Sequence, residues 1–200
     1  MRELVVSEFV SLDGVMEAPR WGPGFAHSGW VTEHPEDPEQ LRFKLDEIRA
    51  ADVLLLGRVT YESFAAAWPE RSDAQGFAEK MNSMRKYVIS TTLTEPQWNN
   101  TRVLDSSVAD SVTELKQQDG GDILLVGSRS LVHTLYRHDL IDEYRFMVFP
   151  VVLGSGRRLF PHDTLKKMPL ELAASKTFPT GVAVHTYRRN RTQPDPAAGL

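Results

Sequence analysis

The sequence predicts one α/β domain built on a mostly parallel sheet. Two short apolar runs, at residues 52–57 and 122–127, each end in glycine and are followed by a helical stretch. Such runs, bounded by turn residues, are typical of strands that are buried on both faces. A third apolar run at residues 86–90 lies between them, so that strands and helices alternate along the chain. This alternation favours a doubly wound sheet flanked by helices.

Local signals predict the other elements of the first part of the chain. A strand is expected at residues 4–10, followed by a long irregular loop at residues 17–38, which is rich in Pro, Gly, Trp and His. Leu41, Leu45 and Ile48 have helical spacing and predict the apolar stripe of a helix at residues 38–51. Further helices are expected at residues 58–67, 74–83, 108–117 and 128–136, and a weak strand at residues 102–104.

The C-terminal part has a different pattern. A run of apolar and aromatic residues predicts one long strand at residues 143–153. Residues 170–178 and 182–188 flank the turn signal Pro179-Thr180-Gly181, so they are expected to pair as an antiparallel hairpin. We therefore predict a single domain at residues 1–190 and a flexible tail at residues 191–200.

Composition excludes several classes of function. A formal net charge of −4 argues against a nucleic-acid-binding protein, because such proteins usually have a basic face. The chain has no cysteine, which excludes disulfides and thiolate metal sites. No apolar run approaches the roughly 20 residues that span a bilayer, and the N-terminus does not read as a signal peptide. We expect a soluble, cytoplasmic protein that binds no membrane.

The junction after the strand at residues 52–57 predicts an anion site. Gly57 permits a tight turn from strand to helix, and the free N–H groups of the helix N-terminus attract anions. Arg58 lies in the first helical turn, where the helix dipole disfavours a cation, so a bound phosphate would explain it. The alternative is a surface arginine at an ordinary strand–helix junction.

Two further strand ends carry similar residues. The motif Gly127-Ser128-Arg129-Ser130 repeats the first junction, and the strand at residues 86–90 ends in Ser90-Thr91-Thr92. Ligands of doubly wound sheets bind beyond the carboxyl ends of the strands. Three donor-bearing ends at one edge of the sheet predict a phosphate-rich ligand such as a dinucleotide.

Several motifs resemble those of dihydrofolate reductases: Ser11-Leu12-Asp13-Gly14-Val15, Leu56-Gly57-Arg58-Val59-Thr60-Tyr61-Glu62-Ser63 and Val88-Ile89-Ser90-Thr91. Later motifs are more similar to a sister group, the reductase domain of the bacterial bifunctional riboflavin-biosynthesis deaminase/reductase and its stand-alone relatives. These motifs are Leu125-Val126-Gly127-Ser128, Leu140-Ile141-Asp142-Glu143-Tyr144 and Pro150-Val151-Val152-Leu153-Gly154-Ser155-Gly156. The resemblance extends over roughly residues 2–188.

The resemblance implies a three-layer dihydrofolate reductase-like fold with a central mixed sheet of about eight strands. It also implies NADPH as the hydride donor. The residues that would bind its phosphates are Gly57, Arg58 and Thr60, with Arg58 near the 2′-phosphate, then Ser90 and Thr91 at the adenosine ribose phosphate, and Gly127, Ser128 and Arg129 at the pyrophosphate. The loop at residues 13–14 would lie over the nicotinamide and the substrate.

The remaining site residues concern proton supply and substrate. Asp13 and Glu8 are the candidate proton donors, although Asp13 can instead be a turn-forming residue before Gly14. Trp21, Trp30 and Trp68 are candidates to contact a planar substrate, with core packing as the alternative. Glu39 is the nearest candidate for the carboxylate that grips the pteridine ring in dihydrofolate reductases.

These features predict an NADPH-dependent reductase that acts on a small pteridine- or pyrimidine-like heterocycle. The alternative is a nucleotide-binding protein or sensor of the same fold without turnover. The resemblance also implies a homodimer, for which the strand at residues 146–153 and the terminal hairpin offer a surface. Because no acid aligns securely with the pteridine-binding carboxylate, little dihydrofolate reductase activity is expected.

Overall fold

The computed structural model describes residues 1–160 and 166–191. The chain divides into two compact units. The first comprises Met1–Val6 and Pro38–Ile141, and the second comprises Ser7–Asp37 and the described chain from Asp142 onward. Most of the predicted tail lies outside the described residues, and the prediction of a single domain stays a prediction.

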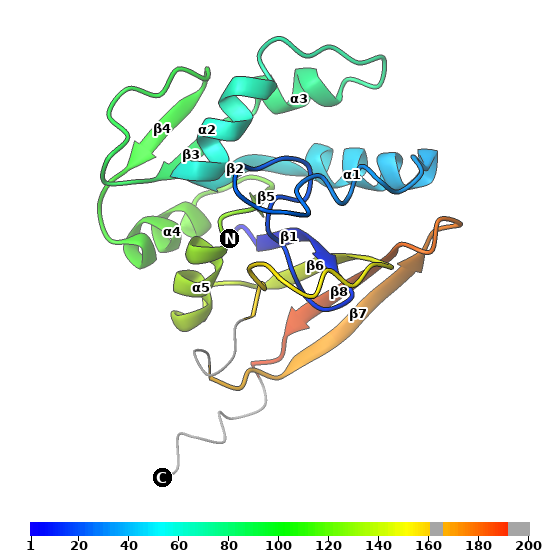
Figure 1. The fold of residues 1–200 in the computed structure, drawn as a ribbon. Coiled ribbons are helices and arrows are strands. Elements are labelled where there is room, and N and C mark those ends of the chain that lie inside the picture. Colours follow the sequence, from blue (N-terminus) through cyan, green and yellow to red (C-terminus); the bar gives the residue numbers. More distant parts are fainter. Residues whose placement is uncertain (161–165, 192–200) are drawn as a thin grey trace. The chain divides into compact units, whose positions relative to one another are not determined.

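The elements follow the predicted alternation (Figure 1). Strand β1, Leu4–Ser11, belongs to both units. The first unit contains helices α1 Pro38–Ala50, α2 Arg58–Ala67, α3 Phe77–Ser83, α4 Val108–Gln117 and α5 Arg129–Arg137, and strands β2 Ala51–Gly57, β3 Arg85–Ile89, β4 Thr101–Leu104 and β5 Asp122–Val126. The second unit contains strands β6 Glu143–Phe149, β7 Leu170–Thr177 and β8 Ala183–Arg189.

The eight strands form one mixed sheet in the order β4-β3-β2-β5-β1-β6-β8-β7. Strand β2 pairs in parallel with β3 and with β5. Strands β6, β7 and β8 pair antiparallel, which confirms the predicted hairpin at the end of the chain. The predicted fold class is therefore confirmed.

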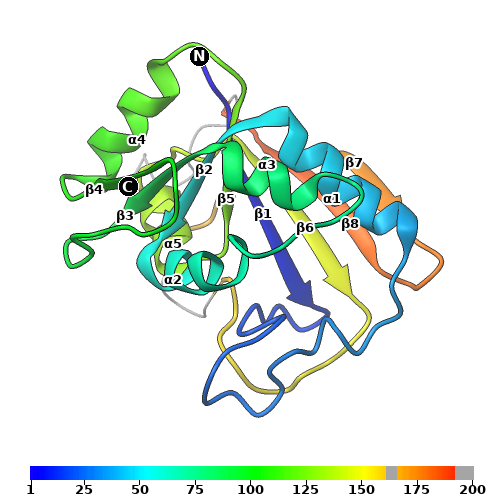
Figure 2. The ribbon, with the colours of Figure 1, turned by 90° about the horizontal axis from the view of Figure 1, so that it is seen from above.

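The core of the first unit explains why β2 is a continuous apolar run. Leu54, Leu55 and Leu56 are fully buried, as expected for a strand with both faces covered. Leu54 and Leu56 belong to a cluster with residues of α1, α2 and α3. Because side chains alternate along a strand, Leu55 faces the other side, which α4 and α5 cover. Figure 2 shows α1 and α3 side by side on their face of the sheet.

Two local predictions are wrong. Leu41 is 47% exposed, so only Leu45 and Ile48 of the predicted stripe face the core. The strand predicted at residues 143–153 ends at Phe149. Pro150 follows and has no N–H to donate to a ladder, and the carbonyl of Val151 accepts a hydrogen bond from the N–H of Leu12 instead (2.8 Å).

The irregular loop predicted before α1 is present, and an aromatic cluster anchors it within the second unit. Trp30 is 1% exposed, and its indole Nε1 donates to the carbonyl of Glu17 (2.9 Å). The Phe149 ring makes edge contacts with Trp30 (5.4 Å between ring centroids) and with Phe9 (5.6 Å). His34 packs against the same ring at 5.2 Å. The loop therefore has its own core although it lacks helices and strands.

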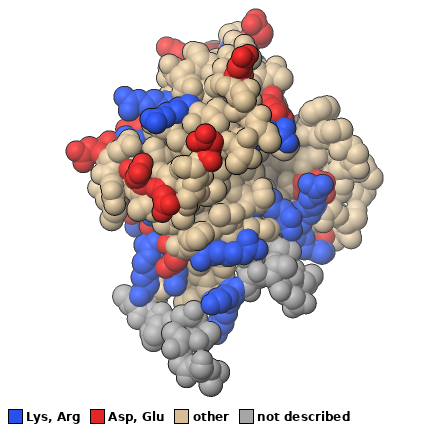
Figure 3. Space-filling view, turned by 90° about the vertical axis from the view of Figure 1, so that its left-hand side faces the viewer, with Lys and Arg blue, Asp and Glu red and all other residues tan. Residues whose placement is uncertain are grey.

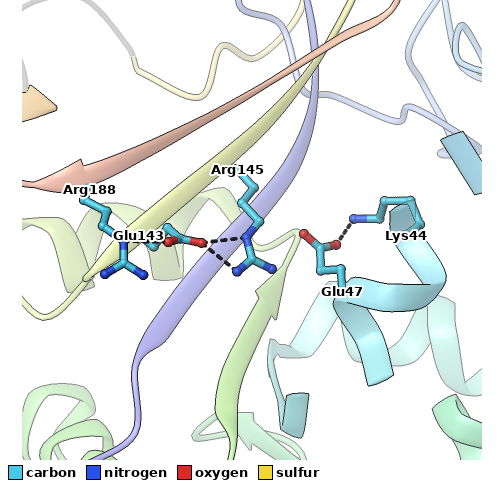
Figure 4. A network of polar contacts seen from close by, with 5 residues as sticks. All are labelled: Lys44, Glu47, Glu143, Arg145 and Arg188. Carbon is cyan, nitrogen blue, oxygen red and sulfur yellow. Dashed lines mark hydrogen bonds and ion pairs between the residues drawn. The ribbon is translucent and has the colours of Figure 1, made fainter. Parts of the chain in front are cut away.

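Buried carboxylates in both units are paired with cations (Figure 4). In the second unit, Glu143 accepts hydrogen bonds from Arg145 Nε (2.6 Å) and Arg188 Nε (2.9 Å). Glu143 and Arg188 are also register partners in β6 and β8, so the ion pair supports the pairing of these strands. In the first unit, Lys44 pairs with the buried Glu47 one turn further along α1. Without these cations each carboxylate would be an unpaired buried charge, which is strongly destabilising.

Candidate functional site

Three strand ends lie side by side at one edge of the sheet in the first unit. Gly57, the last residue of β2, pairs with Ile89, the last residue of β3. On the other side of β2, Leu55 pairs with Leu125, two residues before Gly127. Because all three strands are parallel, the motifs that follow them emerge at the same edge. The predicted alignment of the three strand ends is therefore confirmed.

The two glycine junctions are too closely packed for larger residues. A Cβ atom on Gly57 would lie 2.7 Å from the Ser128 Oγ, and one on Gly127 would lie 2.8 Å from the Thr60 Oγ1. Gly127 also has a φ of +72°, in the left-handed region that glycine adopts without penalty. Each glycine thus makes room for a hydroxyl group of the neighbouring junction.

One hydroxyl links the two junctions. The N–H of Gly57 donates to the Ser128 Oγ (2.6 Å), and the Ser128 hydroxyl donates to the Thr60 Oγ1 (2.9 Å). Ser128 has a φ of 65°, which is unusual for a residue with a Cβ. The structure therefore joins Gly57, Thr60, Gly127 and Ser128 in one contact network.

The helices that start at these junctions have unneutralised N-termini. Neither α2 nor α5 has a side-chain cap or an acid in its first turn, and each begins with an arginine, Arg58 or Arg129. In contrast, α1, α3 and α4 carry Glu39, Glu79 and Asp110 in their first turns. Two helix N-termini at one edge, with no acid in either first turn, favour an anionic ligand with more than one phosphate.

Arg58 has a partner that a ligand can replace. Its Nη1 lies 2.8 Å from Glu62 Oε1, and the two side chains are 46% and 49% exposed. Exposed pairs of this kind contribute only about 0.2–1 kcal/mol. Arg58 can therefore exchange Glu62 for a phosphate at small cost.

The third strand end has a buried and an exposed hydroxyl. Ser90 is 8% exposed, and its Oγ accepts hydrogen bonds from the N–H groups of Thr92 (3.1 Å) and Leu93 (3.0 Å). Thr91 is exposed. Ser90 therefore shapes the turn, and Thr91 is the residue of the predicted pair that a ligand can reach. Their contact with a nucleotide stays a prediction.

The predicted proton donors Asp13 and Glu8 lie in the second unit. Asp13 accepts hydrogen bonds from the Ser11 hydroxyl (2.7 Å) and from the N–H groups of Leu153 (3.1 Å) and Gly154 (3.0 Å). Burial raises the pKa of Asp13, but these hydrogen bonds outweigh it and hold the pKa below its ordinary value. A proton donor needs the opposite shift. The contacts agree with the turn-forming alternative, and a catalytic role stays a prediction, as it does for Glu8, which is buried in β1.

The predicted substrate residues have varied surroundings. Trp21, in the loop of the second unit, is 71% exposed. In the first unit, Glu39 is exposed at the start of α1. Trp68 follows α2 and stacks on the Phe77 ring, 5.4 Å between centroids, with the Arg71 guanidinium 4.9 Å from its ring centroid. These contacts fit the core-packing alternative for Trp68, and substrate contact by all three stays a prediction.

Sequence reasoning missed the residues that hold the Asp13 loop. Arg158 Nε donates to the carbonyl of Asp13 (2.8 Å), and Arg157 Nε lies 3.4 Å from Glu17 Oε1. Both arginines belong to the segment that follows β6. Its arginines lie about 140 residues from their partners, and no local pattern pairs charges over that separation.

Figure 3 shows side chains of both charges on the face that it draws. Within the described residues, no three His, Cys, Asp or Glu side chains are grouped so that they could hold a metal ion. No helix among the described residues has the length and apolar character needed to cross a membrane.

The strand order and the terminal hairpin define a dihydrofolate reductase-like α/β protein. The profile of the RibD C-terminal domain family matches residues 2–184. The chain therefore belongs to the RibD C-terminal domain family, the reductase-like family related to riboflavin biosynthesis that its motifs resemble.

Two Bacillus subtilis proteins are similar in sequence. YyaP is 29% identical over 192 residues, which cover 94% of this chain and 96% of YyaP. YwjB is 29% identical over 143 residues, which cover 72% of this chain and 77% of YwjB.

Two solved structures share the fold. A candidate riboflavin biosynthesis protein from Shewanella sp. PV-4 has a TM-score of 0.70 at 24% identity, covering 94% of this chain and 99% of that one. A pyrimidine reductase-like protein from Corynebacterium diphtheriae has a TM-score of 0.64 at 12% identity, covering 95% and 92%. At these identities the likeness shows the fold alone.

Proposed function

We propose that the protein is an NADPH-dependent reductase that transfers hydride to a small pteridine- or pyrimidine-like heterocycle. Membership of the RibD C-terminal domain family supports reductase chemistry. The observation that carries the cofactor proposal is the pair of uncapped, acid-free helix N-termini at neighbouring parallel strand ends. A dinucleotide supplies the several phosphates that such an edge attracts.

The residues present fit such a cofactor. Gly57 and Gly127 let the two junctions pack closely against each other, and neither α2 nor α5 has a side-chain cap at its N-terminus. Thr60, in the first turn of α2, and Arg129, the first residue of α5, would contact phosphate oxygens. When bound, NADPH supplies a hydride from its nicotinamide ring.

Arg58 is the proposed determinant of NADPH over NADH. A guanidinium–phosphate pair contributes about 1.5–3 kcal/mol, more than the exposed pair with Glu62 that it replaces. The 2′-phosphate is the only group that distinguishes the two cofactors, so Arg58 would discriminate between them.

Asp13 has a supporting part in this proposal. Its carboxylate holds the N–H groups of Leu153 and Gly154, and its carbonyl holds Arg158. It would thereby fix the loop after β1 against the segment after β6. The proton itself would come from a carboxyl group or from an ordered water molecule.

Binding titrations with NADPH and NADH test the cofactor proposal. Wild-type protein should bind NADPH more tightly, and Arg58→Ala should weaken NADPH binding about tenfold or more while leaving NADH nearly unchanged. Arg42→Ala is the matched control, because Arg42 also faces an acid four residues later, Asp46, but in α1 (3.9 Å). Equal losses for both cofactors in Arg58→Ala would contradict the assignment.

Turnover separates a reductase from a nucleotide-binding protein of the same fold. NADPH absorbance should fall when purified protein is given a suitable pteridine, pyrimidine or quinone-like acceptor. Tight NADPH binding without oxidation across such a panel would favour the non-catalytic alternative.

A further inference from the structure

We propose that Ser128 is a positioning residue, which orients the Thr60 hydroxyl so that Thr60 donates to a cofactor phosphate. This proposal rests on the proposed function and assigns Ser128 a different part from direct phosphate contact. It follows from the direction of the two hydrogen bonds that join the junctions of β2 with α2 and of β5 with α5.

The Ser128 hydroxyl is already committed on both sides. It accepts from the N–H of Gly57 at 2.6 Å and donates its own proton to the Thr60 Oγ1 at 2.9 Å. A hydroxyl has one proton, so Ser128 has none left for a ligand. Its short side chain therefore links protein groups to one another.

Thr60 is the last residue in this series of hydrogen bonds, and its hydroxyl can donate to a ligand. Its Oγ1 receives the proton of Ser128, and among the described residues its own hydroxyl proton has no acceptor. Thr60 lies in the first turn of α2, partly exposed, where the helix N–H groups also point. In a chain of hydrogen bonds each donor polarises the next, so Thr60 becomes a stronger donor to an anion.

The backbone at Ser128 supports a role for its hydroxyl. Ser128 has a φ of 65°, whereas glycine would adopt this conformation without strain. A glycine there would remove the link to Gly57 and Thr60. The strained serine is thus explained by what its hydroxyl holds.

A double-mutant cycle on Ser128 and Thr60 tests the proposal, with NADPH and NADH dissociation constants as the readout. Ser128→Ala and Thr60→Val should each weaken both cofactors about three- to tenfold, because both cofactors share the pyrophosphate. The double variant should bind no worse than Thr60→Val alone, since Ser128 acts through Thr60. Thr60→Ser keeps the hydroxyl and should restore most of the affinity.

Ser128→Gly separates positioning from folding. This substitution removes the hydroxyl together with the backbone strain, so Tm should fall less than in Ser128→Ala. Cofactor affinity should nevertheless fall by the same factor in both variants. Thr134→Val is the matched control, because Thr134 donates to the carbonyl of Ser130 further along α5 and should not affect affinity.

The outcomes are distinguishable. Additive losses in the double variant, or wild-type affinity in Ser128→Gly, would overturn the positioning role alone. Failure of the wild-type protein to bind either dinucleotide would overturn the proposed function and this proposal with it.

Discussion

Lys86 is a buried cation held by backbone carbonyls. The residue is 0% exposed in β3, and its Nζ donates to the carbonyls of Asn82 (2.8 Å), Met84 (2.9 Å) and Asn99 (3.2 Å). The ammonium also lies 4.3 Å from the ring centroid of Trp98, a cation–π contact. These contacts tie the loop before β4 to the end of α3, and they reduce the cost of burying this charge.

The titration of Lys86 should affect stability in alkaline solution. Burial lowers the pKa of Lys86 to about 8, below its ordinary value of 10.5. Unfolding therefore takes up a proton between these two values, and the contribution of Lys86 to the free energy of unfolding rises with pH across that window. The limit of this rise is about 3 kcal/mol, because one pKa unit corresponds to about 1.4 kcal/mol.

Denaturant unfolding of wild type and Lys86→Met, from pH 8 to pH 10.5, measures this effect. The difference in unfolding free energy between the two proteins should change with pH in favour of wild type. A difference that stays constant across the window would show that the pKa of Lys86 is not lowered in the folded protein.

The sequence predicts those residues of the candidate site that belong to a local motif. Glycine at a strand end, arginine in a first helical turn and hydroxyls after a strand are all visible in the sequence. The bond from Gly57 to Ser128 was not, because it joins positions 71 residues apart and depends on a left-handed serine. The partners of Asp13 were missed for the same reason.

At the scale of elements, α3 begins later than the sequence predicts. The helix was expected at residues 74–83 and starts at Phe77. Asp73 supplies the reason, since its carboxylate accepts hydrogen bonds from the N–H groups of Phe77 (2.9 Å) and Ala78 (2.6 Å). Residues 74–76 form the turn that brings this cap into place.

The Asp73 cap should lose its effect in acid. Hydrogen bonds from the backbone N–H groups, above all that of Ala78, lower the pKa of Asp73. The cap therefore stabilises the fold fully above the ordinary pKa of a free aspartate, and the effect is lost as pH falls through the lowered value. Asp73→Ala should reduce Tm by roughly 2–4 °C near neutral pH and by less in acid.

Thermal unfolding followed by circular dichroism at neutral and acid pH checks this difference. Asp110→Ala is a useful comparison, because Asp110 lies in the first turn of α4, where Ser107 supplies the side-chain cap. An equal loss of Tm at both pH values in Asp73→Ala would contradict the role of the carboxylate.

The ends of other helices and strands depend on the residues at those ends. Helices α2 and α4 have the predicted bounds. The strand at β6 was predicted too long, because apolar character continues past Phe149 although Pro150 cannot join a ladder. Hydrophobic pattern predicts where a strand can lie, and backbone chemistry decides where it ends.

At the scale of the whole molecule, we propose a homodimer that forms through the terminal hairpin. Strand β7 is an edge strand, exposed over most of its length, and Leu172 on it is 54% exposed. Sedimentation at micromolar concentration should give about twice the chain mass of 22.6 kDa, and Leu172→Lys should shift the protein toward monomer. A clean mass of 22.6 kDa for wild type would contradict the dimer.

The fold class was predictable because strand–helix alternation is written along the chain. The division into two units was not, since each unit combines segments that are distant in sequence. A local sequence pattern predicts a helix or a strand, but it does not show which distant segment of the chain will pack against it to complete a core.

This interleaving has a consequence for synthesis on the ribosome. The second unit needs Ser7–Asp37 and the strands after Asp142, so the whole of Pro38–Ile141 is made in between. Phe9 and Trp30 must wait for Phe149, the ring that they pack against. Until then these early aromatic side chains lack the Phe149 ring and are open to chaperones or to aggregation. All residues of the first unit are made before those of the second are complete, so the second unit can reach its native contacts only near the end of translation.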